Sequence, residues 1–142
     1  MPQYVDGFVL PIPRDNLKHY QRIAKKASKI WREHGALAYY ECVGDDLDAK
    51  DMTPFPKLLK TRSNEVVIFS WAVFKSRRER DRANKAIMAD PRMAKMAEES
   101  HDIFHCSRMA YGGFKVIVQE QAGPEEPAAA ALNAPGEQDG EI

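Results

Sequence analysis

The segment EVVIFSWAVF, residues 65–74, is apolar at every position from Val66 to Phe74 except Ser70. Most of these residues are β-branched or aromatic, which is typical of a strand rather than a helix. Side chains alternate between the two faces of a strand, so both faces of this strand are apolar. Leaving four large side chains of one face in water would lose about 6–12 kcal/mol of favourable burial free energy, comparable to the net stability of a whole domain. The rest of the chain must therefore cover both faces.

Three further strands are predicted around this segment. Residues 4–11 and 36–44 are predicted strands with side chains alternating between two faces, and residues 109–120 are predicted to form the last strand. Residues 45–64 connect two of the strands, and a connection this long without structure of its own is often functional. Its aspartates do not match a calcium-binding EF-hand loop, because Lys50 stands where a ligand is required.

Two helical regions are predicted between the strands. Apolar residues at spacings of three and four predict a helix over residues 14–34. Ser76 and Glu79 match a capping box that begins a second helix, ending near Ala89, and Arg80 is expected on its outer surface. Asp90 and the proline that follows it then begin a short third helix.

The predicted order is strand, helix, strand, strand, helix, strand. This order is typical of α+β ferredoxin-like (βαββαβ) folds, in which helices cover one face of an antiparallel sheet. Because the helices cover only one face, the other apolar face needs a second sheet. A second copy of the chain, related by a two-fold axis, is the most economical source of that sheet. The sequence therefore predicts a homodimeric α/β barrel.

Length and composition are those of one soluble domain. The chain has 142 residues, of which 44% are apolar and 30% charged, and no run is long enough to span a membrane. The first residues lack the basic start and the cleavage site of a secretory signal, so we expect a cytoplasmic protein. Cys42 and Cys106 are too few for a disulfide scaffold, and free thiols fit that compartment.

The formal net charge of zero hides an asymmetry between the two ends of the chain. Residues 121–142 contain five acids and no Lys or Arg, so residues 1–120 carry an excess of five positive charges. The same segment is rich in Ala, Pro and Gly and has hardly any large apolar side chains. We therefore expect a folded domain over residues 1–120 and a disordered acidic tail over residues 121–142.

Several stretches resemble a known family: YVDGFVLPIP, IWREHGALAYYECVGDD, VVIFSW, KSRRERDRANKAIMADPRM and RMAYGGFKVIV. They are similar to the YbaA-like family of bacterial proteins, a family of unknown function in the dimeric α/β-barrel superfamily. The resemblance covers residues 2–120 and implies the ferredoxin-like fold and the dimer, but no established activity. This chain departs from the family pattern at residues 104–106, where it reads FHC.

Each strand carries one polar residue at a position where an apolar one is expected. These residues are Asp6, Glu41, Ser70 and Lys115. We expect them to share the sheet face turned away from the helices, with Tyr39 and Tyr111 at matching positions. A mostly apolar cavity with a few convergent polar groups is the usual form of a small-molecule site. Asp6 and Glu41 are then the candidate catalytic acid and base, and the candidate ligand-binding residues are Tyr39, Ser70, Tyr111 and Lys115.

Two observations leave that site open to other interpretations. The same polar residues could pair with one another or with the partner chain, and so only satisfy hydrogen-bonding groups at the dimer interface. A bulge or close backbone approach at Gly112-Gly113 is also predicted, and a bulge would turn Lys115 to the other face.

We expect no metal and no cofactor. His101, His105 and Cys106 could supply three ligands, but no convincing fourth ligand lies nearby in the sequence. The chain has no glycine-rich phosphate loop, nucleophile elbow or dinucleotide-binding fingerprint.

The first functional hypothesis is a homodimer that binds a small organic molecule in its barrel. Sister families of the superfamily suggest a cofactor-free oxygenase or isomerase, although the sequence leaves open whether the protein is an enzyme. The second hypothesis is an RNA-binding module that uses the basic helix faces, which we consider unlikely because Glu79 and Asp81 dilute those faces and the sheet lacks an RNA-recognition signature. The third is a non-catalytic interaction protein.

Overall fold

Four antiparallel strands form one sheet in the order β2-β3-β1-β4 in the computed structural model, which describes residues 1–123. Most of the predicted acidic tail, residues 124–142, lies outside the described residues. The elements are β1 (Tyr4–Pro13), η1 (Arg14–Asn16), α1 (Leu17–Glu33), β2 (Ala38–Val43), α2 (Phe55–Leu59), β3 (Glu65–Phe74), α3 (Arg77–Met88), α4 (Pro91–Ser100), η2 (Cys106–Arg108) and β4 (Ala110–Lys115). This is the predicted α+β ferredoxin-like arrangement, and the fold class is confirmed.

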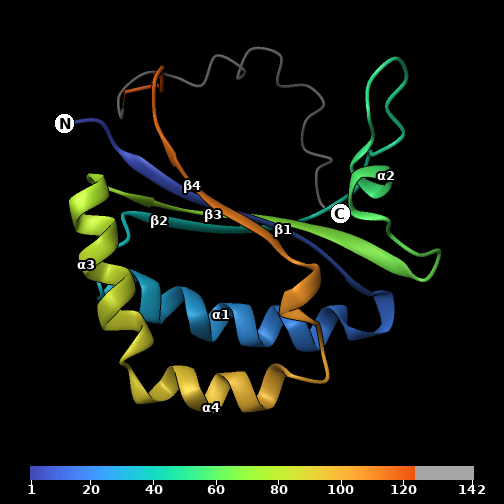
Figure 1. Cartoon of the computed structure of the whole chain (residues 1–142), viewed down its shortest axis with the longest axis horizontal. Coiled ribbons are helices and arrows are strands. Elements are labelled where there is room, and N and C mark those ends of the chain that lie inside the picture. Colours follow the sequence, from blue (N-terminus) through green and yellow to red (C-terminus); the bar gives the residue numbers. More distant parts are fainter. Residues whose placement is uncertain (124–142) are drawn as a thin grey trace.

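The segment at 65–74 is a strand over its whole length and organises the sheet. All ten of its residues pair with β1, and its other edge pairs with β2. The helix-side face of β3 carries Ile68, Ser70, Ala72 and Phe74, all of which are buried. Their burial places the core between the sheet and α1 (Figure 1).

Helices α1, α3 and α4 lie on one side of the sheet, as predicted, whereas the short α2 lies on the other side, where Phe55 contacts Phe69 with ring centroids 6.0 Å apart. The apolar stripe of α1 buries Tyr20, Ala24, Ala27 and Ile30. Figure 1 shows α1 between the sheet and α4, with α3 at one end of the sheet. Because α4 packs on the side of α1 that faces away from the sheet, α1 covers most of this face of the sheet.

The predicted helix starts at Ser76 and Asp90 are both confirmed. The Ser76 hydroxyl accepts a hydrogen bond from the backbone N–H of Glu79 at 3.2 Å, and the Asp90 carboxylate accepts one from the N–H of Arg92 at 3.0 Å. A side-chain acceptor at the first position satisfies a backbone donor that the helix leaves unpaired.

Apart from the contact of α2 with Phe69, residues 1–123 leave the opposite face of the sheet largely uncovered. Tyr40, Phe69 and Phe114 are 54%, 44% and 62% exposed, and Trp71 packs against the Tyr40 ring with centroids 5.0 Å apart. We call these four residues the open aromatic face. The described sheet does not close into a barrel by itself, so a barrel requires a second copy.

Three details differ from the sequence-based expectations. The connection at 45–64 contains the short helix α2, and β4 ends at Lys115 rather than at Glu120. Residues Gly112 and Gly113 pair in regular register with Gly7 and Asp6, so the expected bulge is absent from β4. The alternative expectation of a close approach is confirmed, because a Cβ atom on Gly113 would overlap the Arg80 guanidinium and lie 2.7 Å from the Tyr4 ring.

Candidate functional site

The predicted polar residues share one face of the sheet, but that face is the one turned toward the helices. Glu41 bonds to a tyrosine of α1, Asp6 bonds to two side chains of α3, and Ser70 is buried under the helices. The prediction that they lie on the face turned away from the helices is therefore wrong. The register explains the grouping, because Glu41, Ser70, Phe8 and Tyr111 are paired neighbours across all four strands.

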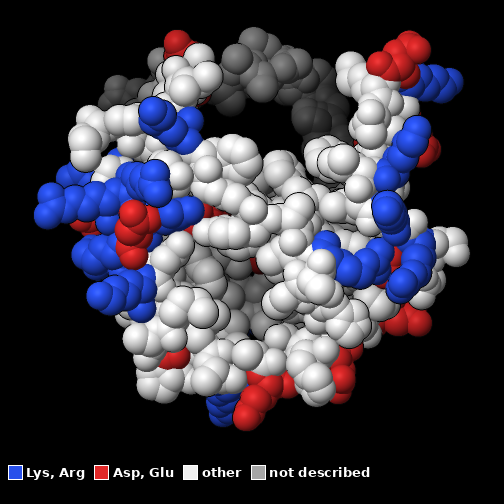
Figure 2. Space-filling model, in the orientation of Figure 1, with Lys and Arg blue, Asp and Glu red and all other residues white. Residues whose placement is uncertain are grey.

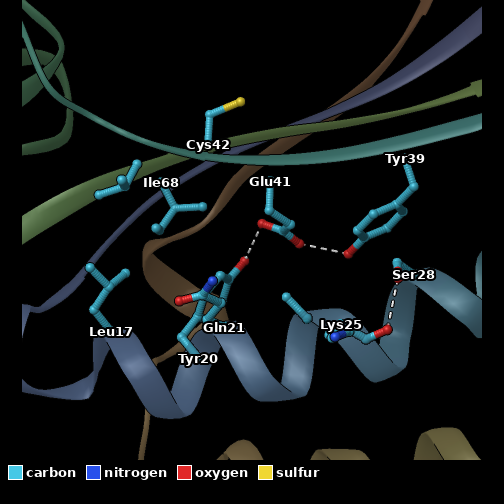
Figure 3. A pocket seen from close by; sticks show the side chains of 11 residues that line it. Leu17, Tyr20, Gln21, Lys25, Ser28, Tyr39, Glu41, Cys42 and Ile68 are labelled. Carbon is cyan, nitrogen blue, oxygen red and sulfur yellow. Dashed lines mark hydrogen bonds between the residues drawn. The ribbon is translucent and has the colours of Figure 1, made fainter. Parts of the chain in front are cut away.

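The Glu41 carboxylate is held between two tyrosine hydroxyls (Figure 3). Oε1 accepts a hydrogen bond from Tyr20 at 2.7 Å, and Oε2 accepts one from Tyr39 at 2.6 Å. Tyr20 comes from α1, whereas Tyr39 lies two residues before Glu41 on β2. The three side chains therefore bridge the helix layer and the sheet.

Burial and hydrogen bonding act in opposite directions on Glu41. Burial raises the pKa of its carboxyl above the ordinary value of 4.5, and the hydroxyls of Tyr39, Tyr20 and Ser70 offset only part of that rise. Burial and the nearby carboxylate also raise the pKa of both Tyr20 and Tyr39, so the two phenols remain neutral donors.

Two cavities meet at this carboxyl. An outer groove of about 490 Å³ and an inner cavity of about 230 Å³ both include Tyr20, Ala24, Tyr39 and Glu41 in their walls. The hydrogen-bonded group of Tyr20, Glu41 and Tyr39 therefore stands at the boundary between them.

The outer groove lies between α1 and the β2 edge of the sheet. Its walls include Gln21, Lys25 and Ser28 from α1, which line it in Figure 3. Cys42 also borders the groove, yet its side chain points away from α1 in that view, as expected for the strand position after Glu41.

The inner cavity is apolar and rich in aromatic and sulfur-containing side chains. Figure 2 shows the face of the molecule that carries α4 and β4 hollowed at its middle, with mostly uncharged walls. Besides the four shared residues and Ser70, the walls contain Phe8, Ile23, Ala27, Trp31, Met93, Met96, Ala97, Ser100, Phe104, Cys106 and Met109.

Asp6 belongs to a different cluster, which ties β1 to α3. Its carboxylate is 1% exposed and accepts hydrogen bonds from Arg80 Nε at 2.9 Å, Tyr111 Oη at 3.2 Å and Asn84 Nδ2 at 3.3 Å. The Arg80 guanidinium also lies 4.9 Å from the centroid of the Tyr4 ring. Arg80 is therefore largely buried, contrary to the expectation that it lies on the outer surface of α3.

Of the remaining four predicted site residues, three divide between these two clusters and Lys115 belongs to neither. Tyr39 and Ser70 lie beside Glu41, whereas Tyr111 bonds to Asp6. Lys115 is exposed and borders a separate depression with Tyr4, Arg77 and Gly113. The structure thus brings together Tyr39, Glu41 and Ser70 but not all six predicted residues.

Two important side chains were not predicted as site residues. Tyr20 counted toward the apolar stripe of its helix, although a buried phenol requires a hydrogen-bond partner. Trp31, which also lies on α1, lines the inner cavity beside Tyr39, with ring centroids 5.7 Å apart.

The surface charges form local pairs. Figure 2 shows basic side chains gathered over α3 and near α2. On α3, however, Arg77 lies 3.7 Å from Asp81, and Arg82 lies 2.9 Å from Glu79. These pairs reduce the positive charge available to a polyanion.

The described residues contain no group of three or more His, Cys, Asp or Glu side chains suited to a metal ion. Among the same residues, no helix has the length and hydropathy needed to cross a bilayer.

Comparison with known sequences confirms the family resemblance. A family described as "Protein of unknown function (DUF1428)" matches residues 3–105. The "Uncharacterized protein YbaA" of Escherichia coli strain K12 is 41% identical over 118 residues, which are 83% of this chain and 99% of YbaA. The protein of that name in Shigella flexneri has the same identity and coverage.

Comparison with solved structures confirms the fold. A dimeric ferredoxin-like protein from an uncultured marine organism has a TM-score of 0.56 at 9% identity, covering 84% of this chain and all of that one. A nipsnap family protein of unknown function from Agrobacterium tumefaciens has a TM-score of 0.51 at 15% identity, covering 81% and 88%. A variant of SnoaB, a cofactor-independent oxygenase from Streptomyces nogalater, has a TM-score of 0.50 at 12% identity, covering 88% and 100%.

Proposed function

Because this chain belongs to the DUF1428 family, which is described as having unknown function, we propose its function from the Glu41 site. The proposal is a cytoplasmic homodimer that binds a small organic molecule between α1 and the sheet, where Glu41 exchanges a proton with it. The observation that carries this proposal is a half-buried carboxyl between two phenols at the junction of two cavities.

The environment of Glu41 suits an acid or base. A carboxyl whose pKa is raised above its ordinary value is, once ionised, a stronger base than an ordinary carboxylate. Tyr20 and Tyr39 fix its orientation, and the apolar walls limit competition from water. Asp6, by contrast, has its oxygens occupied by Arg80, Tyr111 and Asn84, which supports a structural role.

An isomerisation is the simplest reaction for this arrangement. The Glu41 carboxylate would take a proton from a carbon next to a carbonyl, and the C–H electron pair would move into the carbonyl to form an enolate. Return of the proton to another atom completes the reaction without net oxidation. The oxygenase alternative begins with the same proton removal and needs dioxygen as oxidant. SnoaB, a cofactor-independent oxygenase, has this fold, which supports the alternative only by analogy.

The open aromatic face supports the homodimer part of the proposal. Tyr40, Phe69, Trp71 and Phe114 lie on the side of the sheet opposite α1, α3 and α4. A second copy presents the same apolar face, so two sheets can cover each other across a two-fold axis. A solved neighbour with this fold is described as dimeric.

The test is a thermal-shift screen of small carbonyl, hydroxyl and amine compounds against three proteins. These are the wild type, Glu41→Gln, and Glu98→Gln as a control that removes an exposed carboxylate from α4. Compounds that stabilise the wild type and Glu98→Gln are expected to lose most of their effect on Glu41→Gln. Compounds with an acidic C–H bond are then incubated with each protein in D2O.

Deuterium uptake by the compound, followed by NMR, reports proton removal directly. We expect uptake with the wild type and Glu98→Gln and none above background with Glu41→Gln. Equal stabilisation of all three proteins would show that the ligand site does not involve Glu41. Binding without Glu41-dependent uptake would leave a binding protein and contradict the acid–base role.

A further inference from the structure

The side chains that line the inner cavity can supply a negative charge but no positive one. Its lining includes one carboxyl group, that of Glu41, and no Lys, Arg or His. The hydrogen-bond donors that hold this carboxylate, Tyr20 and Tyr39, are neutral phenols. An ionised Glu41 therefore has no cationic partner in its cavity. Lys25 borders only the outer groove, where it is exposed to solvent and its charge is screened.

Aromatic rings form much of the remaining wall. Phe8, Tyr20, Trp31, Tyr39 and Phe104 all line the inner cavity. Trp31 and Tyr39 are inclined at 60° with centroids 5.7 Å apart, and Tyr20 meets Phe104 edge to face at 5.5 Å. The faces of aromatic rings are electron-rich, and they attract cations more strongly where water is excluded.

We propose that the inner cavity selects a compact organic cation, an ammonium group on an apolar body, with the ammonium beside Glu41 and the body among the aromatic and methionine side chains. This inference rests on the proposed ligand-binding role of the cavity and names the class of ligand.

Size and charge both limit the choice of ligand. A cavity of about 230 Å³ is smaller than the roughly 300–1,000 Å³ of sites for drug-sized ligands, so the body is a single ring or a short branched chain. An anionic ligand would place a second negative charge beside Glu41 with no cation to balance it. A neutral ligand could fill the cavity but would leave the carboxylate without a counter-charge, so it is expected to bind less tightly.

The groups that could titrate in the two cavities are few. Besides Glu41 they are Tyr20, Tyr39, Lys25, Cys42 and Cys106. The two phenols have raised pKa values and stay neutral, so Glu41 supplies the negative charge in the inner cavity.

Three probes of similar size test the preference at mildly alkaline pH by isothermal titration calorimetry. They are benzylammonium, benzyl alcohol and benzoate, which share a ring and differ in charge. We expect benzylammonium to bind wild type and Glu98→Gln at least about tenfold more tightly than benzyl alcohol, and benzoate to bind weakest. In Glu41→Gln the preference for benzylammonium over benzyl alcohol should fall below about twofold, mainly through a loss of affinity for benzylammonium.

Equal affinity for benzylammonium and benzyl alcohol in the wild type would overturn the proposal. It would also be overturned by a preference for benzoate, by a charge preference that survives in Glu41→Gln, or by no measurable binding of benzylammonium. None of these results depends on proton removal. If the preference for benzylammonium fails but deuterium uptake depends on Glu41, the ligand class is rejected and the proposed function stands. If the preference holds but no Glu41-dependent uptake occurs, the ligand class stands and the acid–base role is rejected.

Discussion

The Tyr39 hydroxyl donates a 2.6 Å hydrogen bond to the carboxylate of Glu41, two residues further along the same strand. Alternation along β2 puts both side chains on the helix side of the sheet, where the Tyr20 hydroxyl of α1 completes the group at 2.7 Å. This arrangement holds a carboxyl at a defined position between two cavities. It also makes the stability of the protein depend on the charge of one side chain.

Glu41→Gln is expected to become more stable relative to the wild type as pH rises. Folding raises the pKa of Glu41 above its ordinary value of 4.5, so the folded state holds this proton more tightly than the unfolded state. The resulting stabilisation is complete below the unfolded pKa and is lost as pH rises through the folded pKa. Urea unfolding of both proteins at about pH 4 and about pH 7 measures the difference.

The control for this prediction is Glu98→Gln, which should differ from the wild type by less than about 0.5 kcal/mol at both pH values. If the stability of Glu41→Gln relative to the wild type stays constant or falls as pH rises, Glu41 is not desolvated by folding.

Asp6→Ala should lower the free energy of unfolding by about 3 kcal/mol, because it leaves the largely buried Arg80 without its partner on β1. Asp81→Asn, which removes the exposed partner of the same arginine, should cost less than about 1 kcal/mol. Chemical denaturation gives both values. If Asp6→Ala kept wild-type stability but lost ligand binding, Asp6 would belong to the functional site after all.

Gly113→Ala should destabilise the protein by about 1–3 kcal/mol, whereas Gly112→Ala should have little effect. The added methyl group at Gly113 would collide with Arg80 and Tyr4 and displace the guanidinium from Asp6. At Gly112 the nearest atom would be the Phe114 ring at 3.6 Å, an ordinary contact. Thermal unfolding of the two variants side by side measures the difference. Equal effects would show that the Arg80 side chain can move away from the added methyl group without loss of stability.

Phe69→Glu should weaken the proposed dimer by about 100-fold or more, because it places a charge in the middle of the open aromatic face. Met88→Glu is the matched control, since Met88 is 74% exposed on α3, away from that face. Light scattering coupled to size-exclusion chromatography reports the mass of each protein. A wild type that is monomeric at micromolar concentration would contradict the dimer.

The sequence was sufficient to predict the fold because its two strongest patterns are unambiguous. Residues 65–74 could bury both faces only as a central strand, and the apolar stripe of Leu17–Glu33 could belong only to a covering helix. Period-two alternation also placed Asp6, Glu41 and Ser70 on a common face, which the register confirms.

Alternation could not show which face meets the helices. Both faces of β3 are apolar, so the sequence of this strand does not show which face the helices cover. The helix side chains that bond to Glu41 and Asp6 decide which face it is. Tyr20 looked like one more apolar residue of its stripe. Arg80 looked like a surface arginine, although it precedes the buried Ala83 and Ile87 by three and seven residues and so belongs to the inward stripe of α3.

Binding of a small molecule around Glu41 can be located on the protein by amide chemical-shift mapping with NMR. The protein is titrated with the strongest ligand from the thermal-shift screen. We expect the largest shifts at Tyr20, Tyr39, Glu41 and Ser70, around the shared wall of the two cavities. Shifts confined to the open aromatic face, at Tyr40, Phe69 and Phe114, with none around Glu41, would contradict it.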